Sequence, residues 1–173
     1  MGPGAAASIE WMAALCRAEQ LVFALLGDGA TRHPSPVVSV PAVTVADRAG
    51  HRARLWYEAI DTDDPDLLLR PSDADRRVWD RVRALVVDDL TLLVVVADGL
   101  LPCVRRALNA QGADAVADNL LERSRAELDA DREALMDARA RASADPADRA
   151  RADLAAAEVR AEADRVGWPI PGV

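Results

Sequence analysis

Lysine, aromatic residues, cysteine and histidine are all scarce in this chain. Aromatic residues make up 3% of the 173 residues, although apolar residues make up 51%, and all 21 basic residues are arginine. An apolar composition that is rich in alanine and poor in aromatic residues favours helices, so we exclude an all-β fold. The formal net charge is −8. Because binding to nucleic acid backbones needs a basic surplus, nucleic acid is not an expected partner.

The few cysteines and histidines also limit the chemistry. Cys16 and Cys103 each lie in an apolar helical pattern, far from other cysteines or histidines at metal-ligand spacing. We interpret both as core residues. The chain has no glycine-rich phosphate loop and no Gly-x-Ser-x-Gly motif, and two histidines do not support an argument for a catalytic triad. We therefore assign no catalytic residue from the sequence.

A signal peptide and a membrane span are not expected either. The first ten residues lack the basic and apolar segments of a secretory signal, which indicates the cytoplasm. The most apolar run covers 84–101 and contains Asp88, Asp89 and Asp98. Three carboxylates would be costly in lipid, so we predict a buried helix here and no membrane association.

Apolar residues recur at helical spacing through most of the chain. We predict bundle helices over 8–27, 43–60, 73–109 and 114–142, and a C-terminal helix over 146–166. We expect Gly27-Asp28-Gly29 to end the first helix, Pro34, Pro36 and Pro41 to make 31–43 an extended linker, and Pro102 to kink the third helix. Residues 1–173 then form one all-α domain, an up-and-down four-helix bundle with an additional C-terminal helix.

Charged side chains interrupt the apolar faces of three predicted helices. Glu19 lies among apolar residues in the first helix, and His51 shares a face with Glu58 in the second. Asp88 and Asp89 interrupt the third, and periodicity leaves open which of the two faces the core. A buried carboxylate needs a proton, a cation or several hydrogen bonds, so these positions are candidates for a functional centre.

The same three helices contain a pattern of motifs. The motifs are Arg17-Ala-Glu19-Gln-Leu-Val-Phe-Ala-Leu-Leu, Asp47-Arg-Ala-Gly-His51-Arg-Ala-Arg-Leu, and Pro71-Ser-Asp followed by Val87-Asp-Asp-Leu90. Over residues 8–142 this pattern resembles the ferritin-like superfamily, and within it the bacterial MiaE-like tRNA hydroxylase type. The resemblance implies a four-helix bundle that holds two non-haem irons through a glutamate from each of two helices and a Glu-x-x-His pair from each of the other two.

Carried over by position, the resemblance implies a metal or ion-pair centre. Its candidate members are Glu19, His51, Asp88, Asp89 and Glu122.

Two positions depart from the family pattern. Arg48 stands three residues before His51, where the family has glutamate, and Arg125 stands three residues after Glu122, where it has histidine. We hypothesise that these two arginines replace the metals and neutralise Glu19, Asp89 and Glu122 in an ion-pair core.

The helix predicted over 114–142 has two further features. Leu121, Leu128 and Leu135 recur at seven-residue spacing, which would suit a dimer contact. The residues of a neighbouring stripe are small or polar, which predicts that this side of the helix faces either a closely packed element or water. The members of this stripe are Ala117, Ser124, Asp131 and Ala138. We expect the charged residues between 122 and 132, Asp131 among them, to form mostly a solvated face.

Three functions follow from these observations. The first is a ferritin-like bundle that has lost its di-iron site, needs no cofactor and binds a protein partner or a small apolar ligand. The second is an active non-haem hydroxylase or oxygenase with an atypical iron site, for which tRNA would be the partner. The third is a helical module that forms a homodimer through the leucine stripe. The replaced ligands favour the first.

Overall fold

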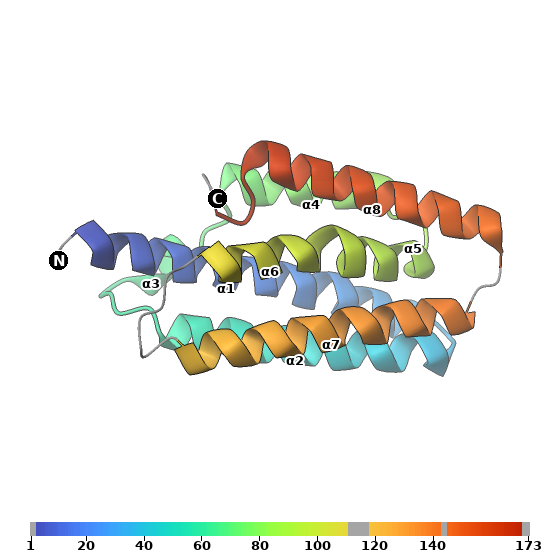
Figure 1. Cartoon of the computed structure of the whole chain (residues 1–173), viewed down its shortest axis with the longest axis horizontal. Coiled ribbons are helices and arrows are strands. Elements are labelled where there is room, and N and C mark those ends of the chain that lie inside the picture. Colours follow the sequence, from blue (N-terminus) through green and yellow to red (C-terminus); the bar gives the residue numbers. More distant parts are fainter. Residues whose placement is uncertain (1–2, 111–117, 143–144, 171–173) are drawn as a thin grey trace.

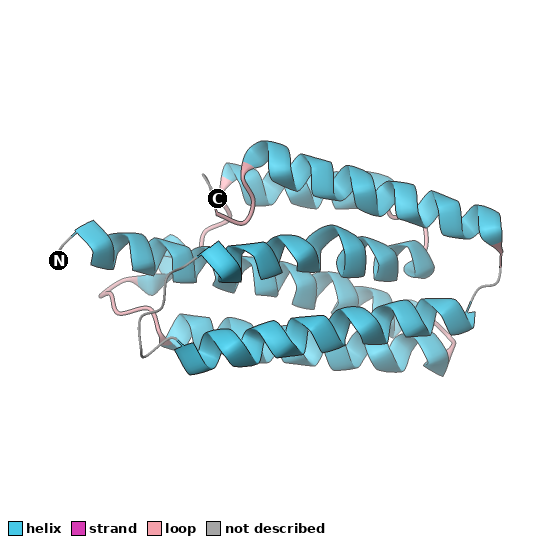
Figure 2. Cartoon of the chain, in the orientation of Figure 1, coloured by secondary structure: helices cyan, strands magenta, loops and turns pink. Residues whose placement is uncertain are grey.

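The computed structural model describes residues 3–110, 118–142 and 145–170. The regular structure in these ranges is helical and contains no strand (Figure 2). The helices are α1 (Pro3–Arg32), α2 (Pro36–Glu58), α3 (Pro65–Leu68), α4 (Asp73–Leu85), α5 (Asp89–Val94), the π-helix η1 (Val95–Leu100), α6 (Leu101–Ala110), α7 (Asp118–Ala142) and α8 (Pro146–Val166). The predicted all-α fold is confirmed. The predicted start of the fourth bundle helix at Asp114 lies outside the described residues.

The long helices form a four-helix bundle with a second layer on one side. The bundle consists of α1, α2, α7 and the continuous segment α5–η1–α6, and the second layer of α4 and α8 (Figure 1). Successive long helices run in opposite directions along the long axis of the molecule. The main apolar core lies between them and includes Leu15, Leu26, Leu93, Leu100 and Leu108. Each helix therefore buries one face against antiparallel neighbours.

The chain reverses direction inside the segment that we predicted as one helix over 73–109. Helix α4 ends at Leu85, and Val86 is extended, with φ −79° and ψ 104°. Asp88 is also extended, and its carboxylate accepts a hydrogen bond from the Thr91 backbone N–H at the start of α5. The prediction of a single helix was wrong because Asp88 is an N-cap, which begins a new helix. The fold thus gains α4 as an additional helix, which lies in the second layer.

The predicted boundary between the first two helices was also wrong. Helix α1 continues through Gly27-Asp28-Gly29 to Arg32, and α2 starts at Pro36 and contains Pro41. Proline suits the first helical position because that residue has no intrahelical partner for an N–H. A Cβ on Gly29 would lie 2.5 Å from Leu92 Cδ2 of α5. Glycine is therefore placed here for helix packing rather than for a helix end.

Pro102 closely follows a π-helix, which interrupts the α-helical hydrogen-bond pattern inside the predicted third helix. Proline has no N–H to donate to the carbonyl of Asp98, four residues earlier. Arg160 of α8 donates to that carbonyl instead. A Cβ on Gly99 would lie 3.3 Å from the Ala156 carbonyl oxygen of α8. The π-helix η1 is thus the place where α8 packs closely on the bundle.

The most apolar run is buried in its second half only, and Val87 in its first half is 68% exposed. It divides between α4, α5 and η1, and residues 91–97 are all buried. In the described ranges, every helix is too short or too polar to cross a membrane.

The leucine stripe of α7 also faces the core. Leu121, Leu128 and Leu135 are at most 2% exposed within a single chain. The prediction that they form a dimer contact was wrong, because the other helices of the same chain already cover them.

Two glycines of α1 provide a matched test of the α1–α5 contact. A Cβ on Gly27 would meet nothing within 4 Å, whereas a Cβ on Gly29 would meet buried Leu92. We expect Gly27→Ala to raise the free energy of unfolding by about 0.5–1 kcal/mol, because alanine favours the helix. We expect Gly29→Ala to lower it by about 1 kcal/mol or more, because Leu92 must move. Urea unfolding of both variants measures this difference, and equal gains in stability would contradict it.

Candidate functional site

The most deeply buried charges lie where α1, α2 and α7 meet. Glu19 and Asp131 are 0% exposed, and Arg52 is 1% exposed. Each comes from a different helix, and each occupies the core-facing side of that helix. Arg52 follows Ala49 by three residues and precedes Trp56 by four, and both of these neighbours are buried. Helical spacing therefore carries Arg52 into the core.

Arg52 bonds two buried carboxylates at once. Its Nε and Nη2 donate to Glu19 Oε1 and Oε2 at 2.8 and 3.0 Å, and its Nη1 donates to Asp131 Oδ2 at 2.8 Å. Arg48, one turn earlier on α2, donates from Nη1 to Asp131 Oδ1 at 2.9 Å. Glu127 Oε2 lies 3.4 Å from Arg52 Nη1. We call these five residues the ion-pair cluster.

The electrostatics of the ion-pair cluster are dominated by burial. Burial raises the pKa of the Glu19 carboxyl above its ordinary value, and the neighbouring Arg52 guanidinium opposes this shift. Burial would lower the pKa of Arg52, but Glu19 and Asp131 outweigh it and raise that pKa. Arg52 therefore stays charged. Its planar, forked guanidinium matches the carboxylates on both sides, which a lysine would not do.

The structure brings only one of the five predicted site residues into this cluster. That residue is Glu19. His51 is exposed on α2, Glu122 is exposed on α7, and Asp88 is an exposed N-cap of α5. Asp89 is half-buried, and its Oδ1 lies 3.7 Å from the Cβ position of Gly29 at the α1–α5 contact.

The two arginines that we expected to replace the metals have different positions. The side chain of Arg48 joins the cluster from its edge and remains 43% exposed. Arg125 lies elsewhere on α7, where its Nη2 donates to the Leu108 carbonyl at 2.5 Å. The hypothesis of an ion-pair core thus needs correction in its members. Arg52 takes the central position, and Asp131 takes the place proposed for Asp89 and Glu122.

Arg52 and Asp131 were missed although the sequence contains a signal for each. The spacing of Ala49, Arg52, Ala53 and Trp56 is that of a buried helix face. Asp131 lies on the stripe with Ser124 and Ala138, both of which are buried. Our expectation that Asp131 belongs to a solvated face was wrong, because this stripe faces α2.

The donor set at the centre of the bundle does not fit a pair of irons. Glu19 and Asp131 both accept hydrogen bonds from Arg52, which occupies the space between them. Among the residues that the structure describes, no three or more His, Cys, Asp or Glu side chains form a group that could hold a metal ion. A guanidinium is a donor of hydrogen bonds and not a metal ligand.

The cysteines are part of the core, as predicted. Both are 0% exposed and free. The Sγ of Cys16 donates to the Ala53 carbonyl at 3.2 Å, and that of Cys103 to the Gly99 carbonyl at 3.3 Å. Burial raises the pKa of each thiol to about 11. Both thiols are thus protonated at neutral pH and are poor nucleophiles.

A cleft between α1 and α4 has a largely apolar lining. Its volume is about 350 Å³, and its lining residues are Arg17, Gln20, Leu21, Leu69, Pro71, Asp75, Arg76, Trp79 and Asp80. We call it the Trp79 cleft. Two arginines and two aspartates lie at its wall, and Arg17 Nε donates to Asp75 Oδ2 at 2.8 Å. The charges of the wall balance, which suits an uncharged ligand.

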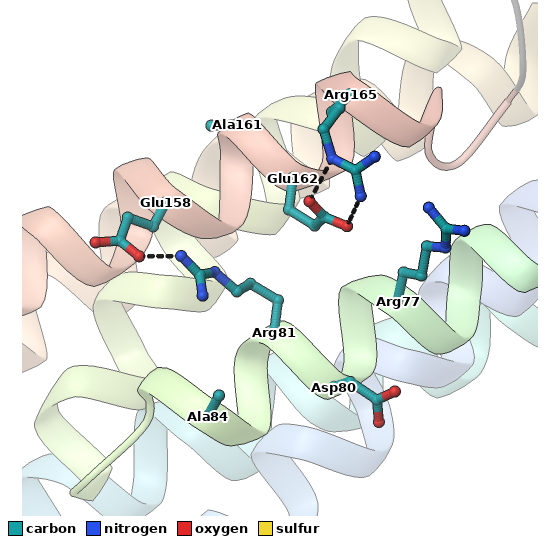
Figure 3. Close-up of a pocket in the computed structure, with 8 residues that line it drawn as sticks. All are labelled: Arg77, Asp80, Arg81, Ala84, Glu158, Ala161, Glu162 and Arg165. Carbon is teal, nitrogen blue, oxygen red and sulfur yellow. Dashed lines mark hydrogen bonds and ion pairs between the residues drawn. The ribbon is translucent and has the colours of Figure 1, made fainter.

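A larger groove between α4 and α8 has a different character. Its volume is about 600 Å³, and it contains three arginines and three acidic residues. Figure 3 shows Arg81 extending toward Glu158 and Arg165 toward Glu162, with Arg77 on the other wall. Because these pairs neutralise one another, the groove has little net charge with which to select an ion.

Comparisons with protein-family models, with curated proteins and with solved structures found no match to this chain. The resemblance to the ferritin-like superfamily therefore stays a prediction, and the function is argued from the side chains described above.

Arg52 and Arg48 provide a matched test of the ion-pair cluster. We expect Arg52→Leu to lower the free energy of unfolding by about 3–5 kcal/mol, because it leaves Glu19 and Asp131 buried without their shared cation. Arg48→Leu removes a half-exposed partner of Asp131 and should cost about 1 kcal/mol or less. Urea unfolding measures both. Equal losses would mean that Arg52 is not the centre of the cluster.

The raised pKa of Glu19 predicts the direction of a pH effect. Between the ordinary value near 4.5 and the raised pKa, folded protein keeps a proton on Glu19 that unfolded protein has lost. The resulting stabilisation is complete below that pH and is lost as the pH rises through the raised pKa. We expect the unfolding free energy of the wild type, relative to Glu19→Gln, to fall with rising pH. Glu122→Gln controls for the change in net charge, and a relative rise would contradict the prediction.

Proposed function

We propose that this chain is a non-catalytic binding protein, a bundle of ferritin-like shape in which an ion-pair cluster replaces the di-iron site. Its ligand is a small, uncharged, largely apolar molecule that binds in the Trp79 cleft. The observation that carries the proposal is the position of Arg52, which bonds both central carboxylates from within the core.

The ion-pair cluster supports a structural role for the interior. In a ferritin-like protein that has its di-iron site, carboxylates of the bundle helices would bind the metal that activates oxygen. In this chain, Glu19 bonds both of its oxygens to Arg52, and Asp131 bonds one oxygen to Arg52 and the other to Arg48. Carboxylates that are bonded in this way are already satisfied and are not free to bind a metal.

The chemistry of the Trp79 cleft supports an apolar ligand. Leu21, Leu69 and Pro71 provide an aliphatic wall, and Trp79 provides an aromatic surface that is half-buried. The guanidinium of Arg83 lies 5.0 Å from the centre of the Trp79 ring and holds it in place. A volume of about 350 Å³ is in the range of small-molecule sites.

Asp75 gives the cleft a rigid frame. Its carboxylate caps α4 by accepting from the Ser72 backbone N–H at 2.7 Å, and it also accepts from Arg17 and from Trp168 Nε1 at 2.9 Å. One side chain thus ties α1, α4 and the residues after α8 together. A pre-formed wall lowers the entropy that a ligand must lose on binding.

The binding proposal can be tested with N-phenyl-1-naphthylamine, an uncharged probe that fluoresces in apolar sites. We expect saturable binding by the wild type, and at least tenfold weaker binding by Trp79→Ser, because the aromatic wall is lost. Leu154→Ser is the matched control, since Leu154 is an exposed apolar residue on α8. Binding that is absent in the wild type, or equal in Trp79→Ser, would refute the proposal.

Iron content tests the alternative function. Protein purified from iron-supplemented cells can be analysed for bound iron, with Glu19→Gln for comparison. One or two irons per chain that are lost in Glu19→Gln would overturn the proposed replacement of the metal site and favour the hydroxylase. Protein that folds and binds the probe without iron supports the binding proposal.

A further inference from the structure

The outer face of the α1–α2 pair carries an unusual share of exposed apolar side chains. Phe23 is 48% exposed, Val43 52% and Tyr57 39%. Phe23 and Tyr57 line a shallow basin of about 700 Å³ together with Gln20, Asp47, Gly50, His51, Ala53 and Arg54, and Val43 lies one turn before Asp47 on α2. Exposed apolar groups that gather around a hollow are typical of a contact surface.

Gly50 lies at the centre of this basin. A Cβ at this position would lie 3.1 Å from Cδ2 of the Phe23 ring, so only glycine leaves the ring and the helix surface undisturbed. The missing side chain is what lets the Phe23 ring lie close against α2. Asp47 lies about one turn before Gly50 and Arg54 about one turn after it, on the same exposed face.

The charged side chains of Asp47 and Arg54 are available to pair with another protein molecule. No hydrogen bond or ion pair joins the Asp47 side chain to any other residue in the described part of the chain, and Asp47 is exposed. Within the described ranges Arg54 pairs only with Glu58, four residues away on the same helix, and both side chains are more than half exposed. Such a surface pair is weak and is easily exchanged.

We propose that this face is the contact surface of a homodimer in which two copies of α2 lie antiparallel about a two-fold axis at Gly50, with the Phe23 rings between the two copies. In an antiparallel pair centred on Gly50, a residue before the glycine faces the residue an equal distance after it on the other copy. Val43 then faces Tyr57, and Asp47 faces position 53, beside Arg54. The pairing thus joins apolar with apolar and acidic with basic side chains, twice over, by the two-fold symmetry.

The charge order favours a second copy over an unrelated partner. A two-fold contact needs a surface that is complementary to itself. The order of apolar Val43, acidic Asp47, small Gly50, basic Arg54 and aromatic Tyr57 has this property, because reversal about Gly50 places Val43 opposite Tyr57 and brings Asp47 next to Arg54. Like charges meet at none of these positions.

Sedimentation velocity over a range of protein concentrations tests the proposal. We expect the wild type to sediment as a dimer, with twice the 18.5 kDa mass of one chain. Asp47→Arg and Arg54→Asp each place like charges together and should weaken the dimer at least tenfold. The double variant restores the opposite charges and should recover most of the lost affinity.

Two further variants separate the contact from general folding effects. Phe23→Glu should abolish the dimer, whereas Leu154→Glu, at a more exposed apolar position on α8, should leave it intact. Circular dichroism checks that each variant is helical. A wild type that stays monomeric at every concentration would overturn the proposal and leave the face to a different partner. A dimer that survives Phe23→Glu, or a double variant as weak as the single ones, would also overturn it.

Discussion

One buried guanidinium organises the interior of this protein. Arg52 satisfies Glu19 of α1 and Asp131 of α7 together, and it does so only when the three helices stand at one register. Burying charges is costly, so such a cluster contributes less to net stability than to the choice of one arrangement, because any slip would leave a charge without its partner. The positions of α1, α2 and α7 depend on this contact.

A second constraint is the short extended segment that Asp88 ends. By capping α5, Asp88 turns the chain back and places α4 and α8 as a separate layer over α5 and η1. Helix α8 of this layer packs closely against η1 at Gly99. Arg160 of α8 donates to the Asp98 carbonyl, to which Pro102 has no N–H to donate. The Trp79 cleft exists because α4 of this layer lies beside α1 of the bundle, and Asp75 joins the two helices by accepting a hydrogen bond from Arg17.

The ferritin-like resemblance predicted the location of the charged centre better than it predicted the residues that form it. It pointed to charged residues at the centre of the bundle, and Glu19 is there. The arginine at the centre is Arg52, one residue after the histidine that the resemblance selected. On a helix, one residue turns a side chain by about 100°, which is enough to exchange the core for solvent. His51 and Gly50 consequently belong to the outer face, where we place the dimer contact.

The sequence by itself determined that the chain is helical, that Cys16 and Cys103 lie in the core, and that Glu19 points toward the core or its margin, because these features follow from composition and local periodicity. Only the tertiary structure decided which charges meet. Asp131 follows Glu19 by more than 100 residues, and the same pattern of charges on α7 would suit a solvated face. The break at Asp88 was equally hidden, because an aspartate can cap a helix or interrupt one, and packing against α8 and α1 selects between these.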